Sequence, residues 1–224
     1  MLVYCTSKFA RLARCRVVSI DYRLAPEHQF PAAIEDSVCA YRALLAEGHK
    51  ASNIAIGGES AGGGLAVATL VAARDRRLSM PAALIALSPW TDMRCESESF
   101  RTKADVDPLL TRRSLKEMAD AYLGGADPLD GRASPAMAKL VGLPPMLVHV
   151  GSEEVLLDDS WALVKVAKAA NVQARLEVWP EMIHVWHMFH PMLPEGAQAI
   201  EALAGFVLEK WKKAEMREQS VQQN

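Results

Sequence analysis

Residues 56–64 read IGGESAGGG, and within this run Gly58–Gly62 form the pattern G-x-S-x-G around Ser60. A short apolar stretch, residues 53–56, precedes the run, and a stretch rich in Ala, Leu and Val follows it. Small residues on both sides of a serine permit the tight strand-to-helix turn that exposes a nucleophilic hydroxyl. The pattern therefore predicts a nucleophile at Ser60, on a turn between a strand and a helix.

A glycine-rich turn has two other common uses, which are close packing and the binding of a phosphate. Neither phosphate pattern fits, because Ser60 takes the place of the second glycine in G-x-G-x-x-G and no Gly-Lys-Ser/Thr follows. Packing alone stays open at this point. A base and an oxyanion site must lie nearby if Ser60 is to react.

The composition indicates one domain, residues 1–224, because half of the 224 residues are apolar and can form a sizeable core. A net charge of −2 argues against nucleic acid or an anionic membrane as the main partner. No apolar run reaches the roughly 18 residues that span a bilayer. Residues 1–5 lack the pattern of a secretory leader.

The cysteines show neither C-x-x-C pairs nor metal-ligand spacing, which predicts buried free thiols and a cytoplasmic protein without metal or cofactor. They are Cys5, Cys15, Cys39 and Cys95.

Short apolar runs alternate with helical periodicity, which predicts an α/β fold around a mostly parallel sheet of about five strands. The expected strands are 16–21, 53–57, 83–88, 146–150 and 175–179. The expected helices are 6–14, 32–47, 61–77, 111–122, 158–170 and 197–213, the last followed by a charged tail that we expect to fray. Residues 89–142 interrupt the rhythm and are expected to line a site or form a lid.

Three chemically suited groups follow expected strands in the order Ser, acid, His, and the carboxyl ends of parallel strands share one crevice. The histidine is His184, just after the last strand. The acid lies within residues 151–159, which hold four carboxylates. Asp158 and Asp159 open a helix, where negative charge is favoured for reasons unrelated to catalysis. Glu153 and Glu154 both remain candidates.

His187 and His190 follow His184 at three-residue intervals and raise the alternative of a metal site. On a helix, this spacing places the outer two roughly 120° apart, so the three rings would not converge on one ion. We expect His187 and His190 to be structural.

At these residues the chain resembles the bacterial branch (family IV) of the hormone-sensitive lipase family of esterases, from about residue 6 to 210. The matching stretches are 21–28 (DYRLAPEH), 30–33 (FPAA), 58–64 (GESAGGG), 88–90 (SPW), 107–108 (DP), 134–135 (SP), 143–145 (LPP) and the segment around His184. The family elbow usually carries Asp where this chain has Glu59.

The resemblance implies an α/β-hydrolase fold and the hydrolysis of small carboxylic esters through an acyl-enzyme. It implies Ser60 as nucleophile and His184 as general base. Laying the family's acid pattern on Gly151 places the catalytic acid at Glu154, with Asp158 in support. The Ala61 N–H is the expected oxyanion donor.

The chain departs from the family pattern at its N-terminal end. The family's His-Gly-Gly-Gly loop, its first strands and part of its lid have no counterpart in these residues. We therefore expect an incomplete N-terminal portion and a reduced rate, because one lost oxyanion donor costs about 10²–10³-fold. Trp90, Met182, Trp186 and Met188 flank the expected crevice, where they are either the walls of an acyl pocket or ordinary core residues.

Two other functions compete with the esterase. Some relatives of this family are non-catalytic receptors for small ligands, and the same three residues would also serve an amidase or a deacetylase. The expected partners are a small ester and, as an assembly, a homodimer.

Overall fold

The computed structural model describes residues 2–222. Residues 223–224 lie outside it, and so does Met1, which belongs to the segment where we expect no leader. Its centre is a parallel sheet of four strands in the order β1-β2-β3-β4. The strands are β1 (Ala55–Glu59), β2 (Ala83–Leu87), β3 (Met146–Gly151) and β4 (Ala174–Trp179). Their carboxyl ends therefore lie along one edge of the sheet, as a shared site requires.

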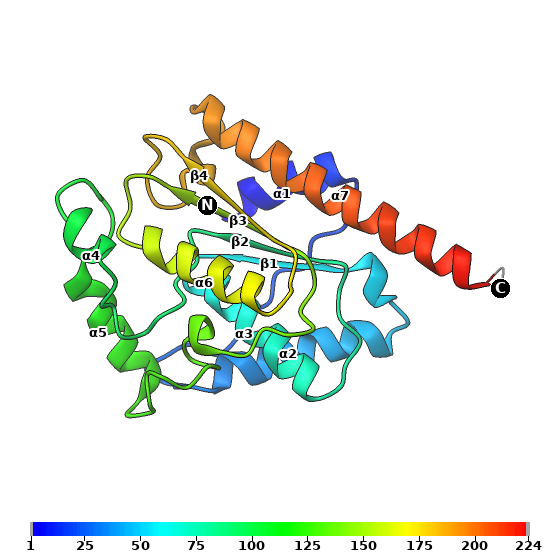
Figure 1. Ribbon diagram of the computed structural model, residues 1–224, viewed down its shortest axis with the longest axis horizontal. Coiled ribbons are helices and arrows are strands. Elements are labelled where there is room, and N and C mark those ends of the chain that lie inside the picture. The colour runs from blue at the N-terminus through cyan, green and yellow to red at the C-terminus, as the bar shows by residue number, and fades with distance from the viewer. Residues whose placement is uncertain (1, 223–224) are drawn as a thin grey trace.

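Helices cover both faces of this sheet (Figure 1). One face carries α1 (Leu2–Ala13) and α7 (Pro194–Gln222), and the other carries α3 (Ala61–Asp75) and α6 (Leu157–Ala169), with α2 (Ala32–Ala46) packed on α3. Among the described residues, no helix has the length and apolar character that crossing a membrane requires.

The side chains of β2 show how the sheet joins its two layers. Leu84 and Ala86 enter the core on the α3 and α6 side, whereas Ala83, Ile85 and Leu87 pack with the α7 side. Successive side chains of a strand point to opposite faces, so a strand covered on both faces is apolar at nearly every position. This explains why the continuous apolar runs in the sequence predicted strands here.

The expected strand at residues 16–21 is wrong. In the described part of the chain this segment pairs with no strand, and Val17, Val18 and Ile20 are exposed. An apolar run becomes a strand only when a neighbour offers backbone groups for the ladder, and this segment has no such neighbour here. The sheet therefore has four strands instead of five.

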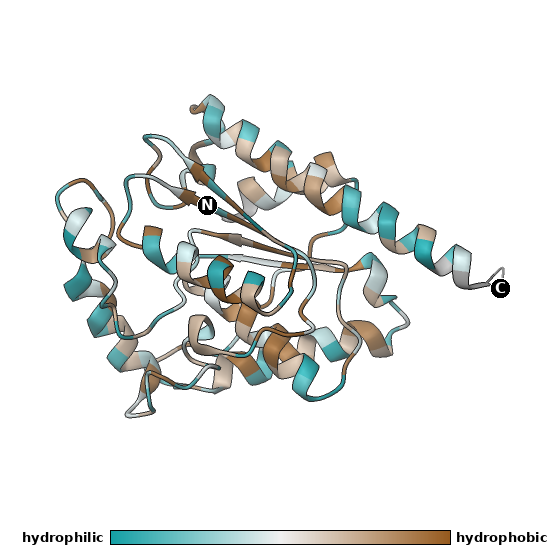
Figure 2. Ribbon diagram, viewed as in Figure 1, coloured by the Kyte–Doolittle hydropathy of each residue, from teal (hydrophilic) through white to brown (hydrophobic). Residues whose placement is uncertain are grey.

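The expected end of the last helix is also wrong, because α7 continues to Gln222. Residues 206–222 contain neither Gly nor Pro and are rich in Glu, Lys and Gln, which are good helix formers. The last turns of this helix extend beyond the sheet and are mostly hydrophilic (Figure 2).

The four cysteines are free thiols, but burial was correctly expected only for Cys5 and Cys95. Cys15 is half-buried and Cys39 is exposed. Cys39 lies on α2, whose buried stripe includes Ile34, Val38 and Tyr41, and residue 39 falls outside that stripe.

Residues 89–142 pack at the carboxyl end of the sheet, where Figure 1 shows α4 (Ser99–Thr102) and α5 (Arg112–Leu123). The expected helix at 111–122 is confirmed: Thr111 and Ser114 form a reciprocal capping box, and Gly124 ends the helix in the left-handed conformation. Apolar side chains of this segment form a separate core that includes Val155 and Leu156. The segment therefore packs against the loop that follows β3.

Asp159 joins this segment to α6 and is almost completely buried. Its Oδ2 accepts hydrogen bonds from the backbone N–H groups of Thr91 (2.8 Å) and Asp92 (3.0 Å). Burial raises the pKa of this carboxyl from 3.8 to about 7. The folded protein therefore binds a proton here more tightly than the unfolded chain does.

A raised carboxyl pKa stabilises the fold at low pH, and that stabilisation is lost as the pH rises from about 4 to about 7. We expect Asp159→Asn, which keeps an acceptor for both N–H groups, to remove this dependence. Between pH 5 and pH 8 the free energy of unfolding of the parent should fall by about 2–3 kcal/mol relative to the variant. Urea unfolding at both pH values measures this difference, and parallel changes in the two proteins would refute the assignment.

Candidate active site

The chain reverses direction at Ser60, between β1 and α3. Ser60 has φ 54° and ψ −123°, a backbone conformation that L-residues rarely adopt. Its carbonyl oxygen accepts hydrogen bonds from the N–H groups of Gly63 (3.0 Å) and Trp90 (2.9 Å), and its own N–H donates to the Leu87 carbonyl (2.8 Å). The backbone thus holds the strained turn without using the Ser60 hydroxyl.

The two glycines of the G-x-S-x-G pattern have unequal roles. A Cβ added to Gly58 would lie 2.1 Å from the Gly62 carbonyl oxygen, whereas a Cβ added to Gly62 would meet nothing within 4 Å. Of these two positions, only position 58 must be glycine, because there the two sides of the turn approach each other too closely for a Cβ.

We accordingly expect Gly58→Ala to destabilise the protein by about 3 kcal/mol, because backbone atoms cannot yield to the new methyl group. Gly62→Ala should change the free energy of unfolding by less than about 0.5 kcal/mol. Thermal unfolding of both variants measures the contrast. Equal losses of stability would contradict the geometry of the turn.

Glu154 is the carboxylate that meets the histidine. Its side chain is fully buried, and its Oε2 lies 2.8 Å from Nδ1 of His184. Its Oε1 accepts hydrogen bonds from the N–H of Gly151 (2.6 Å) and the hydroxyl of Ser88 (2.8 Å). An ionised carboxylate needs such donors when it is buried.

The other three carboxylates of residues 151–159 have different partners. Glu153 pairs with Lys103 at 3.4 Å, Asp158 accepts a hydrogen bond from the N–H of Ser99 (2.7 Å), and Asp159 binds the loop after β2. Asp158 thus ties α4 to the start of α6, which agrees with a supporting position. Of the two glutamates that the residue pattern left open, only Glu154 contacts His184.

The loops after β3 and β4 are held together by backbone contacts. The Glu153 N–H donates to the Met182 carbonyl (3.0 Å), and the Glu181 N–H donates to Ser152 Oγ (2.9 Å). A Cβ on Gly151 would lie 2.1 Å from the Met182 carbonyl oxygen. The two loops therefore approach so closely that only glycine fits at position 151.

Two buried side chains of the 89–142 segment form hydrogen bonds with the backbone of the loop after β3. Oδ2 of Asp107 accepts the Val155 N–H (2.9 Å), and the Ser99 hydroxyl donates to the Val155 carbonyl (2.6 Å). Sequence reasoning assigned neither a role. The only available signal was that Asp107 falls in one of the matching stretches.

His184 is buried in the loop after β4, and this loop reaches back toward β2. The N–H of Val185, the next residue, donates to Ser88 Oγ at the end of β2 (3.1 Å). Ser60 is tied to the same segment through Trp90. The Ser60 hydroxyl itself makes no hydrogen bond within residues 2–222.

Glu59, the residue before the serine, is a further acidic group near His184. Burial raises the pKa of the Glu59 carboxyl, and the charge of His184 acts in the opposite direction. Tyr22, from the 21–28 stretch, also lies within its electrostatic influence, and burial and Glu59 together raise the pKa of that phenol. Glu59, where this chain departs from the family pattern, therefore lies within the electrostatic influence of His184.

His187 is fully buried, and its Nε2 lies 3.1 Å from Nδ1 of His149. Burial lowers its pKa well below 6.5, so the ring is neutral. Trp186 is also fully buried and stacks near His149, which makes it a core residue instead of a pocket wall. In the described part of the chain, no three His, Cys, Asp or Glu side chains are grouped so that they could hold a metal ion.

Trp90 is likewise a core residue, because it is 4% exposed and packs within the 89–142 core. Ala61 is exposed and is the first residue of α3. The N–H groups of a helix's first turn have no partner within the helix, so the Ala61 N–H is available to a developing negative charge.

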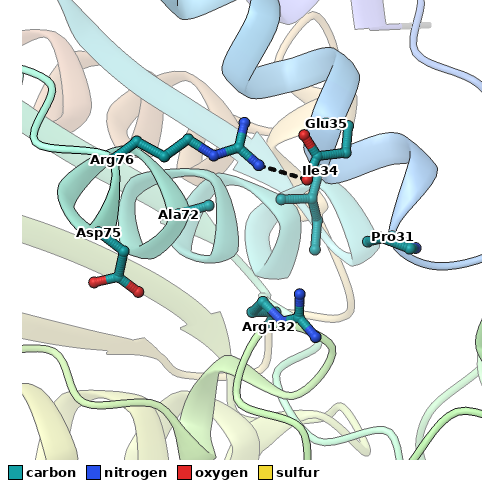
Figure 3. A pocket seen from close by; sticks show the side chains of 7 residues that line it. All are labelled: Pro31, Ile34, Glu35, Ala72, Asp75, Arg76 and Arg132. Carbon is teal, nitrogen blue, oxygen red and sulfur yellow. Dashed lines mark hydrogen bonds and ion pairs between the residues drawn. The ribbon is translucent and has the colours of Figure 1, made fainter.

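A surface hollow of about 260 Å³ lies between α2 and α3, away from these residues (Figure 3). It is lined by Pro31, Ile34, Glu35, Ala72, Asp75, Arg76 and Arg132. Its charged groups are already paired, for example Arg76 with Glu35 and Arg132 with Asp130. The hollow contains none of the predicted site residues.

The sequence matches a family model described as "alpha/beta hydrolase fold" over residues 4–188. It is 48% identical over 202 residues to an acetyl-hydrolase of Streptomyces hygroscopicus, which covers 90% of this chain and 68% of that protein. It is 38% identical over 198 residues to an esterase of Acinetobacter venetianus, which covers 88% of this chain and 65% of that protein. The chain thus spans about two thirds of the length of these relatives.

Solved structures show the same similarity. An esterase from the bacterial hormone-sensitive lipase family superposes with a TM-score of 0.91 at 53% sequence identity. The match covers 92% of this chain and 70% of that one.

Proposed function

The chain belongs to the alpha/beta hydrolase fold family and, within it, to the hormone-sensitive lipase esterases, and on that premise we propose that it hydrolyses small carboxylic esters. The observation that supports this most strongly is the buried 2.8 Å contact between Glu154 and His184, together with Ser60 on its strained turn. Ser60, Glu154 and His184 would supply the nucleophile, acid and base of a serine hydrolase, and they follow one another in the chain order of this fold.

In the proposed mechanism, Ser60 Oγ attacks the ester carbonyl while Nε2 of His184 takes its proton. Glu154 accepts the Nδ1–H of His184, which fixes the tautomer and stabilises the imidazolium. The Ala61 N–H donates to the oxygen that becomes negatively charged. His184 then protonates the leaving alcohol, and a water molecule releases the acid from the acyl-enzyme by the same steps.

Hydrolysis of p-nitrophenyl acetate, butyrate and octanoate by the purified chain tests the function. We expect turnover of the short esters, and a p-nitroanilide of the same acyl group should react more slowly. Preference for the anilide would indicate an amidase. Binding of an ester without release of p-nitrophenol would indicate a receptor and overturn the proposal.

We also propose a cytoplasmic location and a homodimeric state. The free thiols, two of them buried, support a reducing compartment. Sedimentation velocity tests the assembly, since a homodimer has twice the mass of one chain and therefore sediments faster.

A further inference from the structure

Ser88 directly follows β2, at the point where the three loops of the site meet. Its side chain is fully buried, and its φ of 45° is uncommon for a residue other than glycine. Its N–H donates to the His149 carbonyl (2.7 Å), which extends the pairing of β2 with β3 by one residue. The position of the hydroxyl is thus set by the sheet and not by a mobile loop.

The Ser88 hydroxyl has two partners, one on each neighbouring loop. Oγ lies 2.8 Å from Oε1 of Glu154 and 3.1 Å from the backbone N of Val185. An ionised carboxylate only accepts hydrogen bonds and a backbone N–H only donates. The hydroxyl therefore donates to Glu154 and accepts from Val185. These two hydrogen bonds form a bridge between the loop after β3 and the loop after β4.

This bridge connects the proposed acid with the residue that follows the proposed base. Two residues beyond Ser88, the Trp90 N–H donates to the carbonyl oxygen of Ser60 (2.9 Å). The segment 88–90 thus contacts all three arms of the site: the Glu154 carboxylate, the backbone beside His184 and the backbone of Ser60. No other segment described above touches all three.

We propose that Ser88 is a positioning residue that holds the Glu154–His184 pair in register with Ser60. This inference rests on the proposed function, because it assigns Ser88 a part in the same reaction. Without the hydroxyl, Glu154 Oε1 would keep only the Gly151 donor, and the His184 loop would lose its attachment to β2. Small displacements of catalytic groups cost up to about 10²-fold in rate.

The competing interpretation is that Ser88 is an ordinary buried serine whose hydrogen bonds only stabilise the fold. Ser134 provides a matched control. It is equally buried, accepts the Met93 N–H (2.8 Å) and donates to the Pro128 carbonyl (2.6 Å). It contacts none of Ser60, Glu154 and His184 in the described hydrogen-bond network.

The experiment compares Ser88→Ala with Ser134→Ala by thermal unfolding, steady-state kinetics and proton NMR of the imidazole Nδ1–H. Both variants should lose similar amounts of Tm. Only Ser88→Ala should lower kcat, by about 10–100-fold with KM within twofold of the parent. Only Ser88→Ala should also lose the downfield Nδ1–H resonance that a hydrogen bond to Glu154 produces.

Ser88→Gly serves as a second variant, because glycine accepts the positive φ and lacks the same hydroxyl. A kcat equal to that of Ser134→Ala, or an unchanged Nδ1–H resonance, in the folded Ser88 variants would overturn the proposal. The resonance needs no turnover. If the parent chain hydrolyses no ester, the esterase function fails, whereas the resonance alone still decides whether Ser88 positions the pair.

Discussion

Ser60→Ala should abolish ester hydrolysis, with a loss in kcat on the order of 10⁶-fold relative to a fully active enzyme of this class. For this chain the measurable consequence is a fall to the uncatalysed rate. The fold should be unchanged, because the hydrogen bonds that hold the turn come from the Ser60 backbone. Alanine keeps the Cβ and therefore the same strained conformation. Release of p-nitrophenol and thermal unfolding, measured on one preparation, check both parts.

Ser160→Ala is the control for this substitution. Ser160 is fully buried on α6, and its hydroxyl has no partner within the described residues. Its removal should leave activity within a few-fold of the parent. Equal hydrolysis by Ser60→Ala and by the parent would remove Ser60 from the mechanism.

Glu154→Gln should lower kcat by about 10³–10⁴-fold, the second largest effect that we expect. Glutamine has nearly the same shape but carries no charge to stabilise the imidazolium. Its amide group would also present N–H donors to His184, Ser88 or Gly151, which favours the wrong tautomer of the imidazole. KM should change little, because Glu154 is buried behind the histidine.

Glu153→Gln is a closely matched control, since the same substitution is made one residue earlier. Glu153 pairs with Lys103 at the half-exposed rim of the loop. We expect an activity within a few-fold of the parent, because exposed ion pairs contribute little. A large loss in Glu153→Gln with full activity in Glu154→Gln would reverse the assignment of the acid.

Local sequence patterns predicted the parts of the fold that depend on local physics. The helix at α5 has its own cap at Thr111, and the buried strands are apolar on both faces, so each carries its signal within a few residues. Residues 16–21 carry the same apolar signal, but within the part of the chain that the structure describes they have no partner strand. Pairing is a long-range property, and the composition of the segment itself does not reveal it.

The candidate site likewise has a part that the local sequence predicts and a part that depends on long-range contacts. The strand-end positions of Ser60 and His184 could be predicted because parallel strands place their carboxyl ends together. The residues alone did not separate Glu153 from Glu154, because that choice depends on which of two adjacent identical side chains turns inward. The family resemblance favoured Glu154, and the contact of Glu154 with His184 agrees with it. Ser88 and Asp107 act through contacts 66 and 48 residues away in sequence, to Glu154 and Val155. Their roles therefore became visible only in three dimensions.

The central claim is that Ser60 is a nucleophile activated by His184 and Glu154. Labelling with a fluorophosphonate probe, followed by peptide mapping, tests it most directly because the probe reacts only with an activated serine. We predict a label on Ser60 in the parent chain, a much slower reaction in Glu154→Gln, and none in Ser60→Ala. A parent chain that is folded but unlabelled at Ser60, or labelled at the same rate in Glu154→Gln, would contradict the claim.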